Sequence, residues 1–140
     1  MSQPKKRGKK IKIDRHAVYN KLNGRCAYCG EKIGFKQMQV DHIRPQSLFY
    51  VGSVHKKLKN HVHKIPEYHV DDIRNLNPAC RICNYWKHNF SVEEFRNEIQ
   101  QQPKRLMRDS GKFRFAERHG VVEITNNPVK FYFETHDKGA

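Results

Sequence analysis

The sequence is poor in apolar residues, in acids and in long hydrophobic runs. Only 36% of its 140 residues are hydrophobic, which leaves a thin core for a chain of this length. The sequence has no apolar run long enough to cross a bilayer and no basic helix rich in Trp and Leu, so membrane binding is excluded. Asp and Glu number 14 against 28 Lys and Arg, and this excess of cations predicts nucleic acid as the partner.

The N-terminus lacks the apolar stretch of a secretory signal, so we expect a cytoplasmic protein with reduced cysteines. Residues 1–11 contain no acid and are expected to form a disordered basic arm. The length indicates one domain, placed at 12–103, and an extension over 104–140 that packs on its core. The cations of the arm are expected to contact phosphate groups: Lys5, Lys6, Arg7, Lys9 and Lys10.

Local signals predict an α+β fold made of short elements. Ser91 and Glu94 have the spacing of a capping box, and Pro103 is expected to end the helix that they open. The segment 46–74 is rich in Lys and His and gives no clear signal. In chain order we expect a helix over 14–23, a strand over 38–40 that leads into Asp41, a turn over 75–78, helices over 80–89 and 91–102, a short helix ending at Gly120, and strands over 121–124 and 129–133.

Four cysteines occur as two Cys-x-x-Cys pairs. The first pair is Cys26 and Cys29, the second is Cys80 and Cys83, and 50 residues separate them. Each pair can turn both of its thiolates toward one tetrahedral Zn²⁺ ion, and a site closed by four thiolates is structural rather than catalytic. Two disulfides or four buried free cysteines are the alternatives. The reduced compartment favours zinc, which would also stabilise the thin core.

Between the two pairs lies Asp41-His42, which has the chemistry of a phosphodiester-cleaving site. An imidazole titrates near neutral pH, so His42 can activate a water molecule as general base. The carboxylate of Asp41 is a hard oxygen ligand for Mg²⁺ or Mn²⁺. Adjacent side chains of a strand point to opposite sides, so the two groups can approach one phosphate from different directions.

The second cysteine pair opens a helix that carries further polar groups. Asn84, Lys87 and His88 are spaced at i, i+3 and i+4 and so share one helical face. Because zinc would fix Cys83, it would also fix this face relative to the Asp41-His42 strand. Any one of these residues alone would more often be ordinary surface, and their joint order is what indicates a site.

Together these residues resemble an HNH endonuclease with a small ββα-metal core, here stapled by a four-cysteine zinc site and flanked by helices and a short C-terminal β segment. The resemblance covers residues 26–88, and residues 41–47 are also similar to the HNH domain of CRISPR effector nucleases. It implies hydrolysis of double-stranded DNA with a single divalent ion, leaving 5′-phosphate and 3′-hydroxyl ends. By resemblance, His42 is the general base, Asp41 and Asn84 are metal ligands, and Asn75 holds the active-site loop and His42 in place.

Further roles follow from the same resemblance. His88 occupies the position at which colicin-type nucleases have another histidine ligand, with a phosphate contact or a plain surface role as alternatives. Lys87 is expected to contact DNA phosphate rather than metal, because a lysine ligand would have to be deprotonated. Arg44 is also expected to contact DNA. The chain departs from the family pattern in two ways: 32 residues separate His42 from Asn75, and Asn84 replaces the final histidine. Neither departure removes a required chemical group.

Three points stay open at this stage. Trp86, beside Asn84, can stack on a base, but packing on the core is the favoured interpretation. A zinc-stapled module that binds nucleic acid without cleaving it is the alternative function, and a structural ribonucleoprotein component is a third.

A single active site cuts one strand at a time, so a double-strand break would need a homodimer or two events. Small members of similar layout are often encoded by phages, which places the protein in a bacterial or phage-infected cell.

Overall fold

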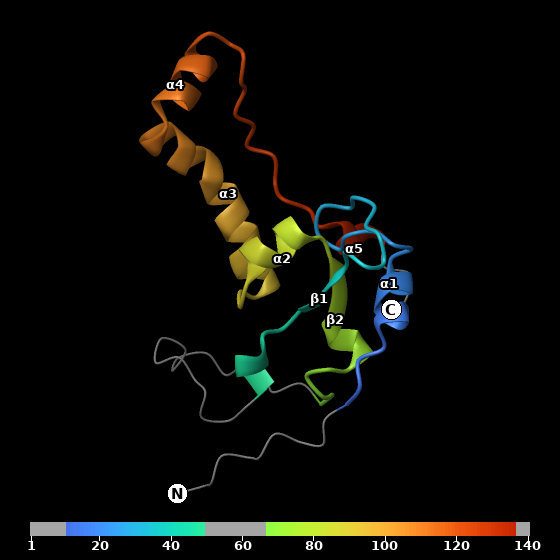
Figure 1. Cartoon of the computed structure of the whole chain (residues 1–140). Helices are drawn as coiled ribbons and strands as arrows, with labels where there is room; N and C mark the ends of the chain where they lie inside the picture. The colour runs from blue at the N-terminus through green and yellow to red at the C-terminus, as the bar shows by residue number, and fades with distance from the viewer. Residues whose placement is uncertain (1–10, 50–66, 137–140) are drawn as a thin grey trace, which may run out of the picture.

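The computed structural model describes residues 11–49 and 67–136 (Figure 1). Apart from Ile11, the basic arm predicted over 1–11 lies outside the described residues, and so do its cations Lys5, Lys6, Arg7, Lys9 and Lys10. Residues 50–66 of the segment between His42 and Asn75 also lie outside them. The α+β class is confirmed by the elements, which in chain order are α1 (Arg15–Lys21), β1 (Gln39–His42), the 3-10 helices η1 (Gln46–Phe49) and η3 (Ile73–Asn75), β2 (Leu76–Ala79), α2 (Arg81–Lys87), α3 (Val92–Asp109), α4 (Gly111–Arg118) and α5 (Tyr132–His136).

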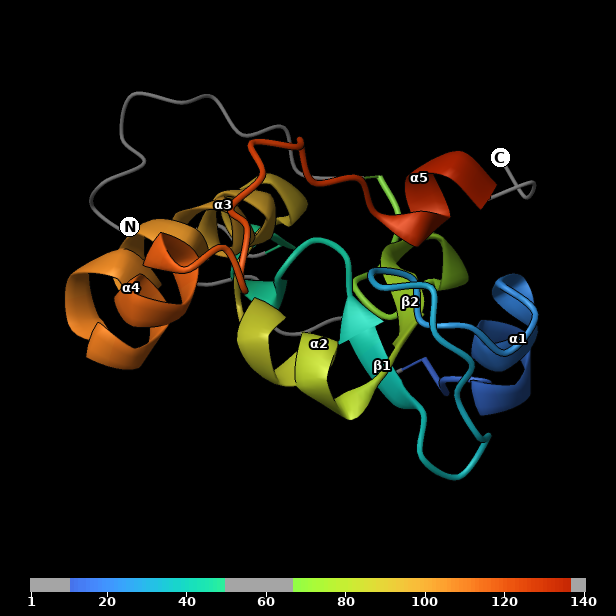
Figure 2. The same ribbon diagram turned by 90° about the horizontal axis from the view of Figure 1, so that it is seen from above.

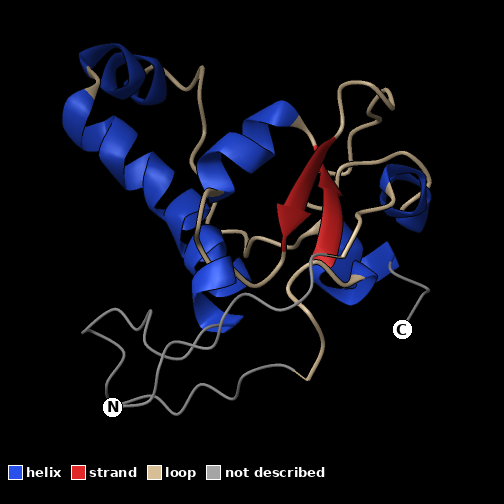
Figure 3. Ribbon diagram, turned by 60° about the horizontal axis from the view of Figure 1, so that its bottom comes forward, coloured by secondary structure: helices blue, strands red, loops and turns tan. Residues whose placement is uncertain are grey.

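An antiparallel pair of strands, β1 and β2, forms the centre of the described part (Figure 3). In its register Asp41 lies opposite Asn77, and His42 lies opposite Leu76. The turn predicted over 75–78 is wrong, because most of that segment is β2. All four β2 residues are buried. A proline is tolerated at position 78 because β2 pairs with β1 alone, so the missing N–H removes no hydrogen bond to a second neighbouring strand. The carbonyl of Pro78 accepts a hydrogen bond from Ala27 N at 2.8 Å.

Helices flank the sheet on two sides, with α1 beside β2 and α2 beside β1 (Figure 2). The predicted helix over 14–23 is confirmed in its main part. Asp14 caps α1, since its side chain accepts hydrogen bonds from the backbone N–H groups of His16 and Ala17 at 3.0 and 3.2 Å. The apolar side of α1 then buries Val18 and Leu22 in the core.

The helix α3 confirms the capping box but not the predicted end. Ser91 Oγ accepts from Glu94 N, and the Glu94 side chain accepts from Ser91 N. Pro103 was expected to end the helix and instead lies inside it, since α3 continues to Asp109. Good helix-forming residues surround the proline, and Arg105 reaches back across it to Glu98, with Nη1 2.7 Å from Oε2. The long helix carries α4 away from the sheet (Figure 1).

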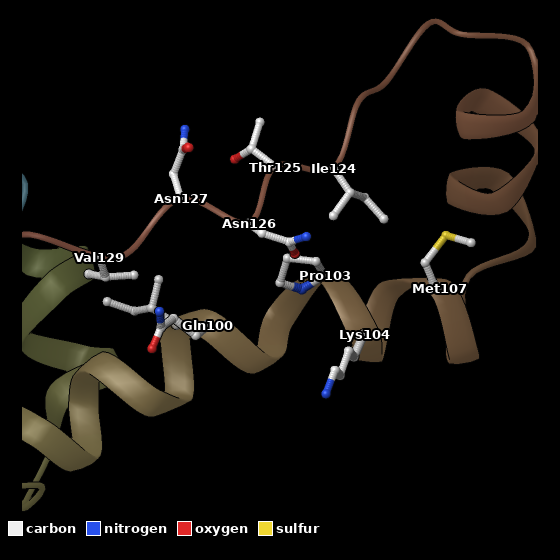
Figure 4. Close-up of a pocket in the computed structure, with 10 residues that line it drawn as sticks. Gln100, Pro103, Lys104, Met107, Ile124, Thr125, Asn126, Asn127 and Val129 are labelled. Carbon is white, nitrogen blue, oxygen red and sulfur yellow. The ribbon is translucent and has the colours of Figure 1, made fainter.

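The strands predicted over 121–124 and 129–133 are wrong, and with them the C-terminal β segment of the expected fold. The segment is irregular up to α5. Its apolar residues cover the core instead: Phe131 is buried and stacks on Phe95 with ring centroids 5.3 Å apart. The backbone N–H groups of Tyr132 and Phe133 bond to carbonyls at positions 28 and 27. Residues 124–129 run along α3 and leave a hollow of about 500 Å³ there (Figure 4).

Candidate active site and cysteine cluster

The four cysteines predicted to share a metal come together. Their sulfur atoms all lie within 4.8 Å of one another, and none is in a disulfide. Cys26 and Cys29 lie in the turn between α1 and β1, where Gly30 (φ +78°) closes the knuckle through a 3.0 Å bond to the carbonyl of Cys26. Cys80 caps α2, and Cys83 lies in its first turn. The gathering of the four residues is therefore confirmed, and the disulfide alternative is wrong.

The spacing and electrostatics of the sulfurs suit a tetrahedral metal ion. Zinc–sulfur bonds of about 2.3 Å place two ligand sulfurs about 3.8 Å apart, and the sulfurs of Cys29 and Cys80 are 3.9 Å apart. A hydrogen bond from Cys83 lowers the pKa of Cys26 to about 4, whereas that bond and burial raise the pKa of Cys83 well above its ordinary value. Such crowding favours one thiolate, and a cation bound between the sulfurs would stabilise all four as thiolates.

Asp41 lies in a buried polar cluster on one side of β1. Its side chain is only 4% exposed, accepts a hydrogen bond from the hydroxyl of Tyr28, and has both oxygens 3.1 Å from Lys87 Nζ. Burial raises the pKa of Asp41, and the Lys87 ammonium opposes that rise. Across the sheet, Asn77 is also buried, and its carboxamide meets no hydrogen-bond partner among residues 11–49 and 67–136. The cluster thus surrounds a carboxylate that already interacts with a cation.

Lys87 joins α2 to the end of β1. Its side chain is fully buried, and Nζ donates a 2.7 Å hydrogen bond to the carbonyl of His42 as well as contacting Asp41. Burial lowers the pKa of Lys87. The predicted contact of Lys87 with DNA phosphate stays a prediction, and in this structure the ammonium faces the protein interior. The Arg44 side chain is exposed after β1, and its DNA contact also stays a prediction.

His42 ends β1 and turns its ring away from this cluster, as the alternation along a strand requires. Its Nε2 lies 2.8 Å from Asp71 Oδ1, and 23% of its side chain is exposed. Asp71 was not singled out from the sequence. The only signal for it there was its place in an acidic pair, Asp71-Asp72, shortly before Asn75 in a chain with few acids.

Asn75 holds the chain that follows His42. Its carboxamide is fully buried, accepts from Arg44 N at 2.9 Å, and donates to the carbonyls of Arg44 and Val70 at 3.2 and 2.9 Å. The carbonyl of Asn75 also accepts from Ile43 N at 2.8 Å. These contacts are those needed by a residue that fixes the loop, the role predicted for Asn75.

The helix α2 presents the remaining candidates. Asn84 is half-buried, and its carboxamide makes no hydrogen bond within the described residues, which leaves its oxygen available to a ligand. His88 is exposed and follows the last turn of α2 with φ +47°. The helix predicted over 80–89 is thus shorter at both ends. The predicted metal-ligand roles of Asn84 and His88 stay predictions.

The predicted packing of Trp86 on the core is wrong. Its side chain is 56% exposed, and that of the neighbouring Tyr85 is 74% exposed. Cys83 and Lys87, four residues apart, take the inner face of α2 because one joins the sulfur cluster and the other reaches Asp41. The two aromatic residues consequently lie on the outer face.

None of the described helices is long and apolar enough to cross a membrane. No family model matches the chain. Over 76 residues, 54% of the chain, the sequence is 38% identical to the SPbeta prophage-derived "putative HNH endonuclease YoqL" of Bacillus subtilis, and the match covers 28% of that protein. This match confirms the family resemblance drawn from the sequence.

Among solved structures, the fold is similar to part of the Type II-C Cas9 enzyme from Actinomyces naeslundii. The TM-score is 0.41 at 19% sequence identity, and the match covers 86% of this chain and 13% of the Cas9 chain.

Proposed function

We propose that the chain is an HNH-type endonuclease that hydrolyses phosphodiester bonds of double-stranded DNA with one divalent metal ion. The observation that carries the proposal is the placement of His42. Its ring is partly exposed and bonded to Asp71, and its carbonyl is held by Lys87. A base for water activation needs this combination of access and fixed orientation.

In this mechanism Asp71 is a positioning residue for the base. A carboxylate only accepts hydrogen bonds, so the proton of a neutral His42 ring lies on Nε2 and is donated to Asp71. Nδ1 is then the ring atom with a free lone pair, and it takes the proton from the attacking water. Asn75 supports the arrangement by holding the backbone of Ile43 and Arg44.

Asp41 and Asn84 would hold the divalent ion, with His88 as a third ligand. The donor atoms are those that Mg²⁺ and Mn²⁺ prefer, a carboxylate oxygen and a carboxamide oxygen, and the Asn84 carboxamide makes no hydrogen bond to the described residues. Both Asp41 oxygens contact Lys87 Nζ in this structure, so a bound ion would have to share the carboxylate with that ammonium or displace it. When bound, the ion supplies positive charge to the phosphate and the leaving oxygen. The protein residues supply the base, its orientation and the position of the scissile bond.

The cysteine cluster would hold a structural Zn²⁺ ion that takes no part in hydrolysis. Cys80 and Cys83 belong to α2, the helix that also carries Asn84 and Lys87. A metal bound there would tie α2 to the knuckle at residues 26–30 and so fix it beside β1. Loss of zinc would therefore affect activity through the position of α2.

The formal net charge of +14 favours DNA as substrate, with Arg44 and the basic arm over 1–11 as proposed phosphate contacts, whereas the buried Lys87 ammonium bonds to Asp41 and to the His42 carbonyl. One active site cuts one strand, so a double-strand break would require a homodimer or a second event. We place the protein in the cytoplasm of a bacterial or phage-infected cell.

The products give a direct test of this function. We expect the protein, loaded with zinc and supplied with Mg²⁺ or Mn²⁺, to nick a duplex and leave ends that DNA ligase reseals, because resealing requires a 5′-phosphate beside a 3′-hydroxyl. Sealed nicks would agree with hydrolysis by an activated water. Binding of the duplex without any cleavage under these conditions would instead indicate the module that only binds nucleic acid.

Replacing Asp71 with Asn is expected to lower the single-turnover rate on saturating DNA by on the order of 10- to 100-fold with little change in DNA affinity. The Asn side chain can donate to Nε2 and so favours the wrong tautomer of His42. Long-range ¹⁵N–¹H spectra of the His42 ring report the tautomer directly. Asp72→Asn is the matched control, because Asp72 pairs with Arg74 and does not contact His42. Equal rates for both variants would remove Asp71 from the mechanism.

A further inference from the structure

The outer face of α2 exposes large apolar side chains. Ile82, Tyr85 and Trp86 are 70%, 74% and 56% exposed, and the two aromatic rings meet edge to face with centroids 5.6 Å apart. The chain is poor in apolar residues, so three of them in one exposed cluster on a seven-residue helix indicate a surface that binds something. Ile82, Tyr85 and Trp86 together form the aromatic face of α2.

The aromatic face adjoins one residue of the proposed active site, Asn84. Asn84, the proposed metal ligand, lines a hollow of about 460 Å³ together with the aromatic face, and Arg81 and Gln39 complete its wall. A second hollow, of about 360 Å³, is lined by the same Trp86 and by Phe95. The indole therefore borders open space in two hollows, one of which is shared with Asn84.

Charge selects among possible occupants of this face. The chain carries a formal net charge of +14, and Arg81 is exposed beside the aromatic residues. A flat apolar group attached to a polyanion matches both properties, and a nucleobase on its phosphate backbone is such a group. A protein partner would match both only if acidic residues surrounded its apolar patch.

We propose that Trp86 and Tyr85 stack on unpaired nucleobases beside the phosphodiester that is cleaved. This inference rests on the proposed function and names the substrate class: duplex DNA interrupted by unpaired nucleotides, such as a bulge or a flap. A side chain can stack only on a base face that no neighbouring base covers. In an uninterrupted duplex these faces are covered, and uncovering them costs free energy.

The test uses Trp86 itself, because it is the single tryptophan of the chain. The His42→Ala variant, which keeps the DNA intact, is titrated with a bulged duplex and with a fully paired duplex of equal length. We expect the bulged duplex to quench Trp86 emission strongly and the paired duplex to quench it weakly. Trp86→Ala should weaken binding to the bulged duplex by about ten-fold or more and leave binding to the paired duplex unchanged. Trp86→Phe should retain most of the preference.

Phe115→Ala is the matched control, since Phe115 is 67% exposed on α4 and lies outside the aromatic face. Equal quenching by both duplexes, or none, overturns the inference even if Trp86→Ala fails to fold, because that measurement needs no substitution at Trp86. Cleavage by the unmodified protein is measured on the same two duplexes. Cleavage with no preference and no quenching keeps the proposed function and removes the base-stacking site. Selective quenching without cleavage keeps the base-stacking site and removes the nuclease.

Discussion

Cys80→Ala is expected to release the structural metal and to abolish cooperative unfolding or lower the melting temperature by more than about 15 °C. Apparent zinc-binding free energies in small zinc domains are about 10–16 kcal/mol, and whole domains are stable by only about 5–15 kcal/mol. With 36% hydrophobic residues, the core of this chain has little to replace that contribution. One kcal/mol corresponds to roughly 4–8 °C in a domain of about 60–100 residues and roughly 2–4 °C in one of about 150–250, and this chain of 140 residues lies between them. Thermal unfolding followed by circular dichroism measures the shift.

Ile82→Ala is the control for this prediction. Ile82 lies between the two cysteines of α2 but is 70% exposed, so its truncation should leave both the metal content and the melting temperature nearly unchanged. Atomic absorption on the purified protein should give one zinc per chain, and less in Cys80→Ala. A wild type that purifies without zinc, or a Cys80→Ala variant that melts at the wild-type temperature, would contradict the zinc assignment.

His42→Ala is expected to lower the rate of DNA cleavage by about 10²- to 10⁴-fold, the range for loss of a general base. The fold should survive, because the His42 ring is partly exposed and its structural contact, the carbonyl bonded to Lys87, belongs to the backbone. Single-turnover cleavage of a labelled duplex at saturating protein isolates the chemical step. Zinc content and melting temperature should match those of the wild type.

His119→Ala provides the comparison for this variant. His119 is exposed at the end of α4, outside the candidate site, so the substitution should leave the rate within about two-fold of the wild type. If His42→Ala cleaved as fast as His119→Ala, another group would have to activate the water.

Sequence reasoning found the parts of the site that depend on local order. Paired cysteines have few other uses in a chain without disulfides, so the sulfur cluster could be predicted from spacing alone. Asp41-His42 and the capping box of α3 were recognisable for the same reason. The strand signal of β1 was correct because Val40 and its neighbours alternate as a half-buried strand does.

The errors arose where tertiary packing outweighs local preference. Asn77 and Pro78 suppress the strand signal of β2, yet burial against β1 makes the segment a strand. Pro103 costs one hydrogen bond, and the rest of α3 tolerates that loss. The apolar run around Phe131 gave a strand signal, but the Phe131 ring packs on Tyr28 and Phe95 and the segment pairs with no strand within the described residues.

Two features of the site were beyond sequence reasoning because they are contacts between distant residues. Asp71 meets His42 across 29 positions, and Lys87 meets Asp41 across 46. Once Lys87 takes the inner face of α2, Trp86 has to point outward. The inward lysine therefore explains the exposed tryptophan, which the sequence suggested was buried.

The most direct test of the nuclease assignment is a supercoiled-plasmid assay with zinc-loaded protein. Wild type and His42→Ala are incubated side by side with Mg²⁺ or Mn²⁺, with EDTA in a third reaction and zinc content checked afterward. We predict relaxed or linear plasmid with the wild type and a divalent ion, and unchanged supercoiled plasmid in the other two reactions. Plasmid binding without cleavage by the wild type, with branched and single-stranded DNA and RNA also uncut, would contradict the nuclease and leave a nucleic-acid-binding module.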